Sequence, residues 1–454
     1  MRHREGWQAA GMRYPELYIL SGLLIVLAIA GGASRAGEWG QLFVRVAAIL
    51  AMLALTVTRR QRNWQSVRLP LILLGLVAGI AALQLVPLPP ALWTMMPGRA
   101  PFMAAVPIGP QPWRPINLTP DEGLNTLLSL SVPLAILVTL ASVPAARRAT
   151  VVDIMLGMII SSALVGSIEL AGGGFASPFI NNTPGDASGL FANRNHQALL
   201  LALGLPLLAV RAFRSTDRRM RPMAWALAIA LAVWLLMLIL ATGSRAGLAL
   251  AGLGLMSSVI IVWRSLKRTG LRLPRWALPA FIGAIGAVIA LVVFVGMASD
   301  RAQSLTRLAA SGEAGDIRVS SLPLLRNLIG SYFPFGSGFG SFDPVFRIIE
   351  PFDLLAPTYF NHAHNEVIEL LIETGIAGAA IIGYLLFAWA YLGRSCWRSL
   401  RSGSAIGFAS WSALTMIAVA SLVDYPARTP IIMAIAMLCA WLARPIENDA
   451  ALPS

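Results

Sequence analysis

Residues 223–241 read MAWALAIALAVWLLMLILA, a run of nineteen residues without a charge. A helix of this length covers about 28 Å, close to the ~30 Å hydrocarbon core of a bilayer. In lipid the backbone polar groups must be satisfied within the segment, so the run predicts a membrane-spanning helix. The rest of the chain repeats this pattern on both sides of it.

Comparable apolar runs predict about twelve spanning helices along the 454-residue chain. Hydrophobic residues make up 57% of the chain and charged residues only 12%, whereas soluble domains carry about 25% charge. The predicted fold is therefore an all-α polytopic membrane protein. The runs lie at 17–33, 39–57, 69–86, 124–142, 151–171, 196–213, 223–241, 245–263, 277–298, 364–392, 405–423 and 427–443.

Basic residues are concentrated in alternate connections between these runs. The positive-inside rule places those connections and both termini in the cytoplasm. The net charge of +14 is then mainly a topology signal, and we do not expect nucleic-acid binding. The first run has no small-residue cleavage site, so we interpret it as an anchor. The basic connections are 59–68, 147–148, 211–221, 264–275 and 394–401.

The connections on the outer side are long, and they divide the chain into three parts. Residues 1–298 carry nine spans, with outer loops at 87–123 and 172–195, and residues 364–454 carry the last three spans. Between them, 299–363 is predicted to be a large, partly helical outer loop. Loops of that length are usually functional. We find no matched pair of broken helices, which an inverted-repeat transporter would be expected to show.

Three stretches at the outer ends of spans contain arginine, or histidine with asparagine, or all three: FANRNH at 191–196, TGSRAG at 242–247 and NHAHN at 361–365. Arginine binds phosphate oxygens with two parallel hydrogen bonds and stays charged. Histidine can take a proton from an alcohol near neutral pH. Such residues fit the transfer of a sugar from a lipid pyrophosphate to a hydroxyl, with the leaving phosphate stabilised by the arginines. The long loop adds Arg301, Arg307, Arg318, Arg326 and Arg347.

Structural explanations compete with this interpretation. An interfacial arginine such as Arg301 or Arg194 can extend to lipid headgroups and only anchor its span. His196 can act as a helix cap. His362 and His364 are two residues apart, but two ligands make a poor zinc site, so no metal is expected. The two cysteines in the chain support neither a disulfide framework nor a cysteine-based metal site.

The segment that follows His364 contains three carboxylates on one helical face, Glu366, Glu369 and Glu373. An acidic residue in a first turn is a common helix start. Glu373 lies about 14 Å deeper than His364, so we expect it to have a buried cationic partner. The glycine-rich run at 336–340 resembles a phosphate-binding loop only loosely, and a structural role is favoured.

Four motifs, in this order, resemble the O-antigen ligase/polymerase superfamily: Phe-x-Asn-Arg-Asn-His at 191–196, Gly-Ser-Arg-Ala-Gly at 243–247, Gly-x-Gly-x-Gly-Ser-Phe at 336–342 and His-Asn-x9-Gly-x2-Gly at 364–378. The last is the most specific, because both glycines fall at the ligase spacing. The resemblance covers roughly residues 150–395.

The resemblance implies a GT-C-like glycosyltransferase of the bacterial inner membrane whose site faces the periplasm. Its donor would be a glycan on undecaprenyl pyrophosphate, and it would need neither cofactor nor metal. Arg194, Arg245 and Arg318 would hold the pyrophosphate. His364 would act as base on the acceptor hydroxyl, giving inversion at the anomeric carbon. Lower-ranked substrate-binding candidates are His362, Asn365, Arg326, Arg347 and Glu369.

Several activities remain compatible with the resemblance. A ligase would transfer finished O-antigen to lipid A–core, which the motif spacing favours. A polymerase would join one lipid-linked repeat to another in O-antigen or exopolysaccharide synthesis. Outside the superfamily, a flippase for a lipid-linked sugar would also use arginines that face a phosphate, and a non-catalytic scaffold of the assembly machinery would need none of these side chains.

Overall fold

The computed structural model describes residues 14–35, 37–58, 61–106, 108–172, 187–214, 219–268, 283, 321–352 and 360–445. The predicted span 277–298 lies outside these residues, apart from residue 283. The candidates Arg301, Arg307 and Arg318 lie outside them too.

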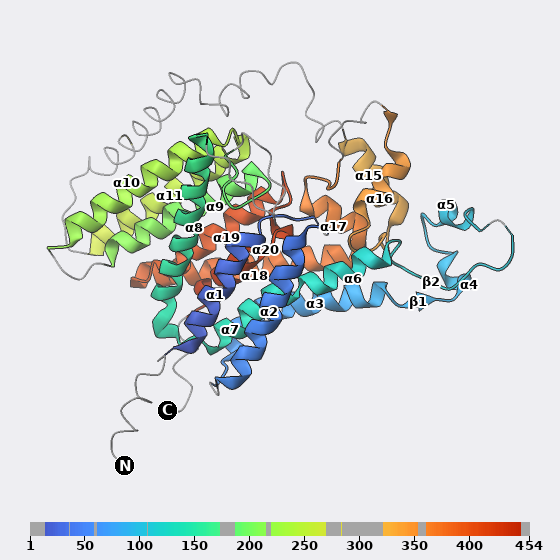
Figure 1. Ribbon diagram of the computed structural model, residues 1–454, viewed down its shortest axis with the longest axis horizontal. Coiled ribbons are helices and arrows are strands. Elements are labelled where there is room, and N and C mark those ends of the chain that lie inside the picture. The colour runs from blue at the N-terminus through green and yellow to red at the C-terminus, as the bar shows by residue number, and fades with distance from the viewer. Residues whose placement is uncertain are drawn as a thin grey trace, which may run out of the picture.

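Helices form almost all of the described structure (Figure 1). Those in the first half are α1 (Pro15–Ala30), α2 (Trp39–Val57), η1 (Trp64–Val67), α3 (Arg68–Gln84), α4 (Pro90–Trp93), α5 (Ala100–Met103), α6 (Pro120–Ser129), α7 (Ser131–Ser142), η2 (Ala145–Arg147), α8 (Arg148–Leu170) and α9 (Arg194–Phe213). Those in the second half are α10 (Arg221–Ala241), α11 (Arg245–Arg268), α15 (Leu322–Tyr332), α16 (Phe342–Ile349), α17 (Glu366–Thr374), α18 (Ile376–Ser402), α19 (Ile406–Ala420), η4 (Pro426–Arg428) and α20 (Pro430–Ala443).

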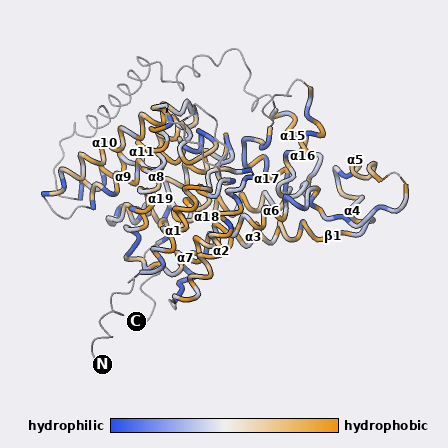
Figure 2. Tube along the Cα trace, in the orientation of Figure 1, coloured by the Kyte–Doolittle hydropathy of each residue, from blue (hydrophilic) through white to orange (hydrophobic). Residues whose placement is uncertain are grey.

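The multi-span prediction is confirmed. Among the described residues, eight helical segments are long and apolar enough to cross a membrane, and α1, α19 and α20 are shorter apolar helices. Together they account for every predicted run except 277–298. Figure 2 shows apolar residues along these helices and hydrophilic residues around α17. The molecule is an all-α polytopic membrane protein.

α9 is the most enclosed of these helices, with α8, α10, α11 and α19 packed around it. Small residues allow α11 to approach it closely. A Cβ added at Gly247 would lie 2.5 Å from Cβ of Ala198, and one added at Gly254 would lie 2.9 Å from the Ala202 carbonyl oxygen. Close backbone approach through small residues is a common way to pack helices in membranes. The packing therefore brings the starts of α9 and α11 side by side.

The run 364–392 was predicted as one span, and this prediction is wrong. Two helices, α17 and α18, meet at Gly375, whose φ is +56°. A Cβ at Gly375 would lie 2.0 Å from the carbonyl oxygen of Pro334, so only glycine fits there. α18 alone is long enough to span. α17 lies ahead of it, outside the spanning helix, and begins next to the connection between α19 and α20, where the backbone N–H of Glu366 donates to the carbonyl oxygen of Ser421 at 2.8 Å.

The described parts of loops 87–123 and 299–363 contact each other beside α17. In the first, β1 (Pro87–Leu88) pairs antiparallel with β2 (Arg114–Pro115). Arg99 is 1% exposed and donates from Nη2 to the carbonyl oxygens of Ile116 at 2.8 Å and Gly336 at 3.1 Å. In the second, α15 and α16 form a small apolar core of their own with residues next to α17. The first loop is thus joined to the second through a buried arginine.

Candidate active site

The start of α17 holds His364 in an unusual backbone conformation. Asn365 caps the helix, because its Oδ1 accepts from the backbone N–H of Ile368 at 3.0 Å and its Nδ2 donates to the Leu422 carbonyl oxygen at 2.9 Å. His364 has φ +50°, in the left-handed region that non-glycine residues rarely adopt. Nδ1 of His364 lies 2.9 Å from the carbonyl oxygen of His362. Since a carbonyl oxygen only accepts, Nδ1 carries the hydrogen, and in the neutral ring the lone pair is on Nε2.

His362 is held by a buried ion pair at the centre of the site. Its Nδ1 donates to Oε1 of Glu369 at 2.8 Å, and the same oxygen lies 3.1 Å from a guanidinium nitrogen of Arg428. The second carboxylate oxygen accepts from the backbone N–H of Ala363 at 2.9 Å. Burial would raise the pKa of Glu369, but Arg428 and His362 outweigh burial and hold this pKa below its ordinary value. Glu369 is therefore an ionised, fully bonded carboxylate.

Arg428 is also the cationic partner expected for Glu373, although its own side chain is 25% exposed. Its Nη2 lies 3.1 Å from Oε2 of Glu373, whose side chain is completely buried. Arg428 belongs to η4, in the connection between α19 and α20, so one guanidinium joins this connection to two turns of α17. Breaking a buried pair of this kind is strongly destabilising, because it leaves an uncompensated charge.

The glycine-rich run 336–340 has a structural role around Glu373. The backbone N–H of Gly338 donates to the carbonyl oxygen of Glu373 at 2.8 Å, and that of Gly340 donates to its Oε1 at 2.9 Å. Nε2 of Gln84, at the end of α3, donates to the same carbonyl at 2.9 Å. These donors satisfy the end of α17, where a helix leaves carbonyl groups without intrahelical partners. The run binds protein acceptors, as the structural interpretation predicted.

A row of aromatic rings supports His364 from the outer loop. Phe342 and Phe346 of α16 stack with centroids 5.6 Å apart, and Phe346 lies 5.1 Å from Phe360. Phe360 in turn stacks on the imidazole of His364 at 5.1 Å with an interplanar angle of 22°. The position of this ring is therefore set both by its hydrogen bond and by packing against the loop.

The stretches 191–196 and 361–365 meet at residues 424–425. Asp424 accepts from Nδ2 of Asn195 at 2.6 Å, and its other oxygen lies 3.9 Å from Nε2 of His196. The ring of Tyr425 lies 5.4 Å from the ring of His196 and 5.1 Å from that of His364. Burial, then Asp424, raises the pKa of Tyr425 to about 12, so its hydroxyl stays protonated. The ring of Tyr425 therefore lies between His196 and His364.

Two of the arginine candidates, Arg194 and Arg245, are the first residues of two neighbouring helices. Arg194 is the first residue of α9, whose cap Asn193 accepts from the Asn195 N–H at 2.8 Å. Arg245 is the exposed first residue of α11, where Oγ of Ser244 accepts from the Gly247 N–H at 2.9 Å. The packing of Gly247 on Ala198 places these starts together. Helix N-termini favour anions, because their N–H groups and dipole point outward.

The remaining loop arginines are arranged differently. Arg347 binds Asp343 one turn earlier on α16, with Nε 2.6 Å from Oδ1. Arg326 is exposed on α15. Arg318, ranked with the pyrophosphate ligands, lies outside the described residues. Around α17 the structure thus joins His362, His364, Asn365 and Glu369, while Arg326 and Arg347 lie on the helices of the outer loop.

Asp424, Tyr425 and Arg428 were missed by the sequence analysis. Asp424 and Tyr425 fell between the predicted spans 405–423 and 427–443, and Arg428 fell inside the second of these spans. The available signal was the one that drew attention to Arg245: a short polar connection between apolar helices contains an acid and an arginine, which is costly without a partner. The partners of Arg428 lie about sixty residues earlier and those of Asp424 about 230 residues earlier, beyond what local spacing can show.

Residues 230–383 match the family model described as O-Antigen ligase. The match includes Arg245, His362, His364 and Glu369, begins after Arg194, and ends before Asp424. No curated protein matches the chain. Within the described part of the chain, no three His, Cys, Asp or Glu side chains are grouped so that they could hold a metal ion.

Proposed function

We propose that this protein is a member of the O-antigen ligase superfamily, whose family model matches residues 230–383, and that it is an inverting, metal-independent glycosyltransferase that uses a glycan on undecaprenyl pyrophosphate. The proposed acceptor is a hydroxyl of lipid A–core, which makes the protein an O-antigen ligase. A polymerase of the same superfamily is the alternative, with a second lipid-linked repeat as acceptor.

The observation that carries this proposal is the hydrogen bond from Nδ1 of His364 to the His362 carbonyl. It leaves Nε2 of the neutral ring as the proton acceptor, which a general base requires. The left-handed backbone of His364 supports the same role, because strain of this kind collects at functional sites. Stacking on Phe360 fixes the direction of the ring.

The donor pyrophosphate is proposed to bind at the paired starts of α9 and α11. Arg194 and Arg245 supply guanidinium groups there. The two helix N-termini add backbone N–H donors, whose partial positive charge also favours a phosphate. Arg318 stays a prediction as a third ligand. Charge that develops on the leaving pyrophosphate is stabilised by donors already in place, which is commonly the largest catalytic contribution.

The proposed reaction is a single displacement. The acceptor oxygen attacks the anomeric carbon opposite the pyrophosphate and forms the new glycosidic bond. The bond from that carbon to the phosphate oxygen breaks, and the electron pair leaves with undecaprenyl pyrophosphate. The acceptor proton passes to Nε2 of His364 and then to solvent. Attack from the opposite face inverts the anomeric configuration.

Glu369 and Arg428 are proposed as positioning residues. Glu369 orients the ring of His362, and His362 contributes the carbonyl that sets the tautomer of His364. Arg428 keeps Glu369 ionised. Neither Glu369 nor Arg428 is proposed to act on the substrate.

The proposed orientation puts this site at the periplasmic face of the inner membrane. The basic connections belong to the opposite ends of the same helices, and such connections remain in the cytoplasm. α9 starts at the site and ends near Arg211 and Arg214, next to the basic connection 211–221. Both termini are then cytoplasmic.

The test is a transfer assay with the full-length protein in detergent, with EDTA present. Undecaprenyl-pyrophosphate oligosaccharide is offered with lipid A–core and, separately, alone. Product only with lipid A–core, lost in His364→Ala, is the expected result. Longer lipid-linked chains from the donor alone would identify a polymerase. Absence of both products, alongside an active ligase and an active polymerase as controls, would overturn the transferase proposal, and translocation of the donor in liposomes would then favour a flippase.

A further inference from the structure

A cavity lies at the other end of the bundle from the proposed active site, between α3, α18 and the end of α20. Its volume is about 350 Å³, within the range of roughly 300–1,000 Å³ typical of small-molecule pockets. Arg68 begins α3, whose far end, Gln84, contacts Glu373 of the site. At 1.5 Å per residue, the two ends of α3 are about 24 Å apart. The cavity is therefore separate from the proposed active site.

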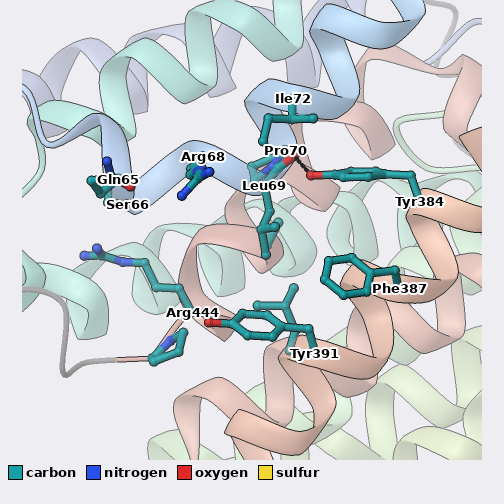
Figure 3. A pocket seen from close by; sticks show the side chains of 13 residues that line it. Gln65, Ser66, Arg68, Leu69, Pro70, Ile72, Tyr384, Phe387, Tyr391 and Arg444 are labelled. Atoms are coloured by element: carbon teal, nitrogen blue, oxygen red, sulfur yellow. Dashed lines mark hydrogen bonds between the residues drawn. The ribbon is translucent and has the colours of Figure 1, made fainter.

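The cavity has one polar side and one apolar side. Figure 3 shows Gln65, Arg68 and Arg444 on one side, with Tyr384, Phe387 and Tyr391 of α18 on the other. Tyr384 donates its hydroxyl to the carbonyl oxygen of Leu69 at 2.8 Å, which ties α18 to the start of α3. A site built in this way suits a ligand that has a charged end and an apolar end.

The charged side of the cavity is cationic. All of its lining residues lie in the described part of the chain, and they include two arginines but no carboxylate. Guanidinium groups hold phosphate oxygens through paired hydrogen bonds. The complementary charged group is a phosphate.

The apolar side opens toward the bilayer. Phe387 is 60% exposed and Tyr391 47% exposed, so this wall continues onto the lipid-facing surface of α18. α20 has only 14 residues and ends at the cavity, whereas α18 continues to Ser402. Fourteen helical residues cover about 21 Å, less than the ~30 Å hydrocarbon core. The cavity thus lies where one helix ends early, at the depth of headgroups and the first acyl carbons.

We propose that this cavity binds an anionic phospholipid of the cytoplasmic leaflet. Arg68 and Arg444 hold the phosphate, and an acyl chain runs along Phe387 and Tyr391. Basic pockets between membrane helices on that side suit anionic headgroups. An alternative explanation is that each arginine only extends to the lipid headgroups. That would account for a positive charge at this depth, but not for a cavity that has both a polar and an aromatic wall. The site is independent of the proposed glycosyl transfer.

Native mass spectrometry of the full-length protein in detergent tests this proposal. Phosphatidylglycerol is titrated, with phosphatidylethanolamine and inorganic phosphate in separate arms. Retained phosphatidylglycerol adducts and weak phosphatidylethanolamine adducts are expected. Arg68→Gln should weaken binding about fivefold, and the double variant with Arg444→Gln should weaken it further. Arg398→Gln, an exposed arginine at the same end of α18 that does not line the cavity, should leave binding unchanged.

A second variant tests the cavity without removing charge. Ala440→Phe adds a ring to the lining and should block phospholipid binding while both arginines remain. Equal phosphatidylglycerol binding by wild type, Arg68→Gln and Ala440→Phe would overturn the proposal. Displacement of the lipid by inorganic phosphate alone would overturn it as well, because the cavity would then be a site for free phosphate.

Discussion

The starts of α9 and α17 contain the same residue types, but they place their histidines differently. Asn193 caps α9 and Asn365 caps α17. His196 is 1% exposed, and neither of its ring nitrogens has a hydrogen bond within the described structure. His364 is partly exposed, and its Nδ1 is bound to a carbonyl. Tyr425 packs against both rings, so the two histidines are separated by a single side chain.

This difference shows that residue type and spacing predict a polar helix start but not the role of its histidine. We therefore expect His364, which is partly exposed and has a fixed tautomer, to accept a proton from the substrate, and we do not expect this of the buried His196. The two helix starts can therefore be distinguished by experiment.

The largest expected effect is that of His364→Ala. We expect kcat/KM for glycan transfer to fall by about 10³-fold, because general bases contribute roughly 10² to 10⁴. His364→Gly should lose as much activity but unfold at a higher temperature than the alanine variant, because glycine tolerates the positive φ. Transfer kinetics and thermal unfolding measure the two effects. Activity near the wild-type value in both variants would remove His364 from the mechanism.

Arg245→Lys at the start of α11 should lower kcat/KM by about 10²-fold. Lysine keeps the positive charge but loses the paired geometry of the guanidinium. The matched control is Arg398→Lys, an exposed arginine at the opposite end of the bundle, which should change the rate little. A rate for Arg245→Lys equal to that of the control would mean that Arg245 only anchors its helix.

Arg428→Gln tests the buried pairs behind α17. We expect a loss of about 3–5 kcal/mol in the free energy of unfolding, since Glu369 and Glu373 would be left buried without a cation. Thermal unfolding of the purified protein measures it. Adding Glu369→Gln and Glu373→Gln to this variant should recover much of the loss. If the triple variant were no more stable than Arg428→Gln, the charge-based explanation would fail.

Glu366 should produce a moderate dependence of stability on pH. Burial raises its pKa to about 7, partly offset by Ser421 and Arg428. A raised pKa contributes stability that is complete below the unfolded value, about 4.3, and is lost as pH rises through about 7. The melting temperature should therefore fall between about pH 5 and pH 8, and Glu366→Gln should remove that part of the decrease. An identical pH dependence in wild type and variant would contradict this assignment.

The smallest effect is expected for His196→Phe, the counterpart of the His364 variants. The ring size is similar, and an unbonded buried polar group is removed, so stability should be unchanged or slightly higher. Transfer kinetics should stay within about twofold of wild type. A loss comparable with that of His364→Ala would show that both sides of Tyr425 take part in the reaction.

Much of the fold and part of the site could be predicted from the sequence. Runs such as 223–241 predicted spanning helices because the bilayer fixes their length. The need of Glu373 for a buried cation followed from its depth. The break at Gly375 could not be predicted, because it depends on the close approach of Pro334, about forty residues earlier. Asp424, Tyr425 and Arg428 were missed for the same reason.

By itself, the sequence determined the membrane class, most of the described spans and the chemical types of the candidate residues, because these follow from local hydrophobicity and short spacing. Tertiary structure alone decided that Arg428 neutralises Glu369 and Glu373, that Tyr425 separates His196 from His364, and that the starts of α9 and α11 lie together. A helix positions its own residues over a few turns. Contacts between distant helices depend on packing that local spacing does not encode.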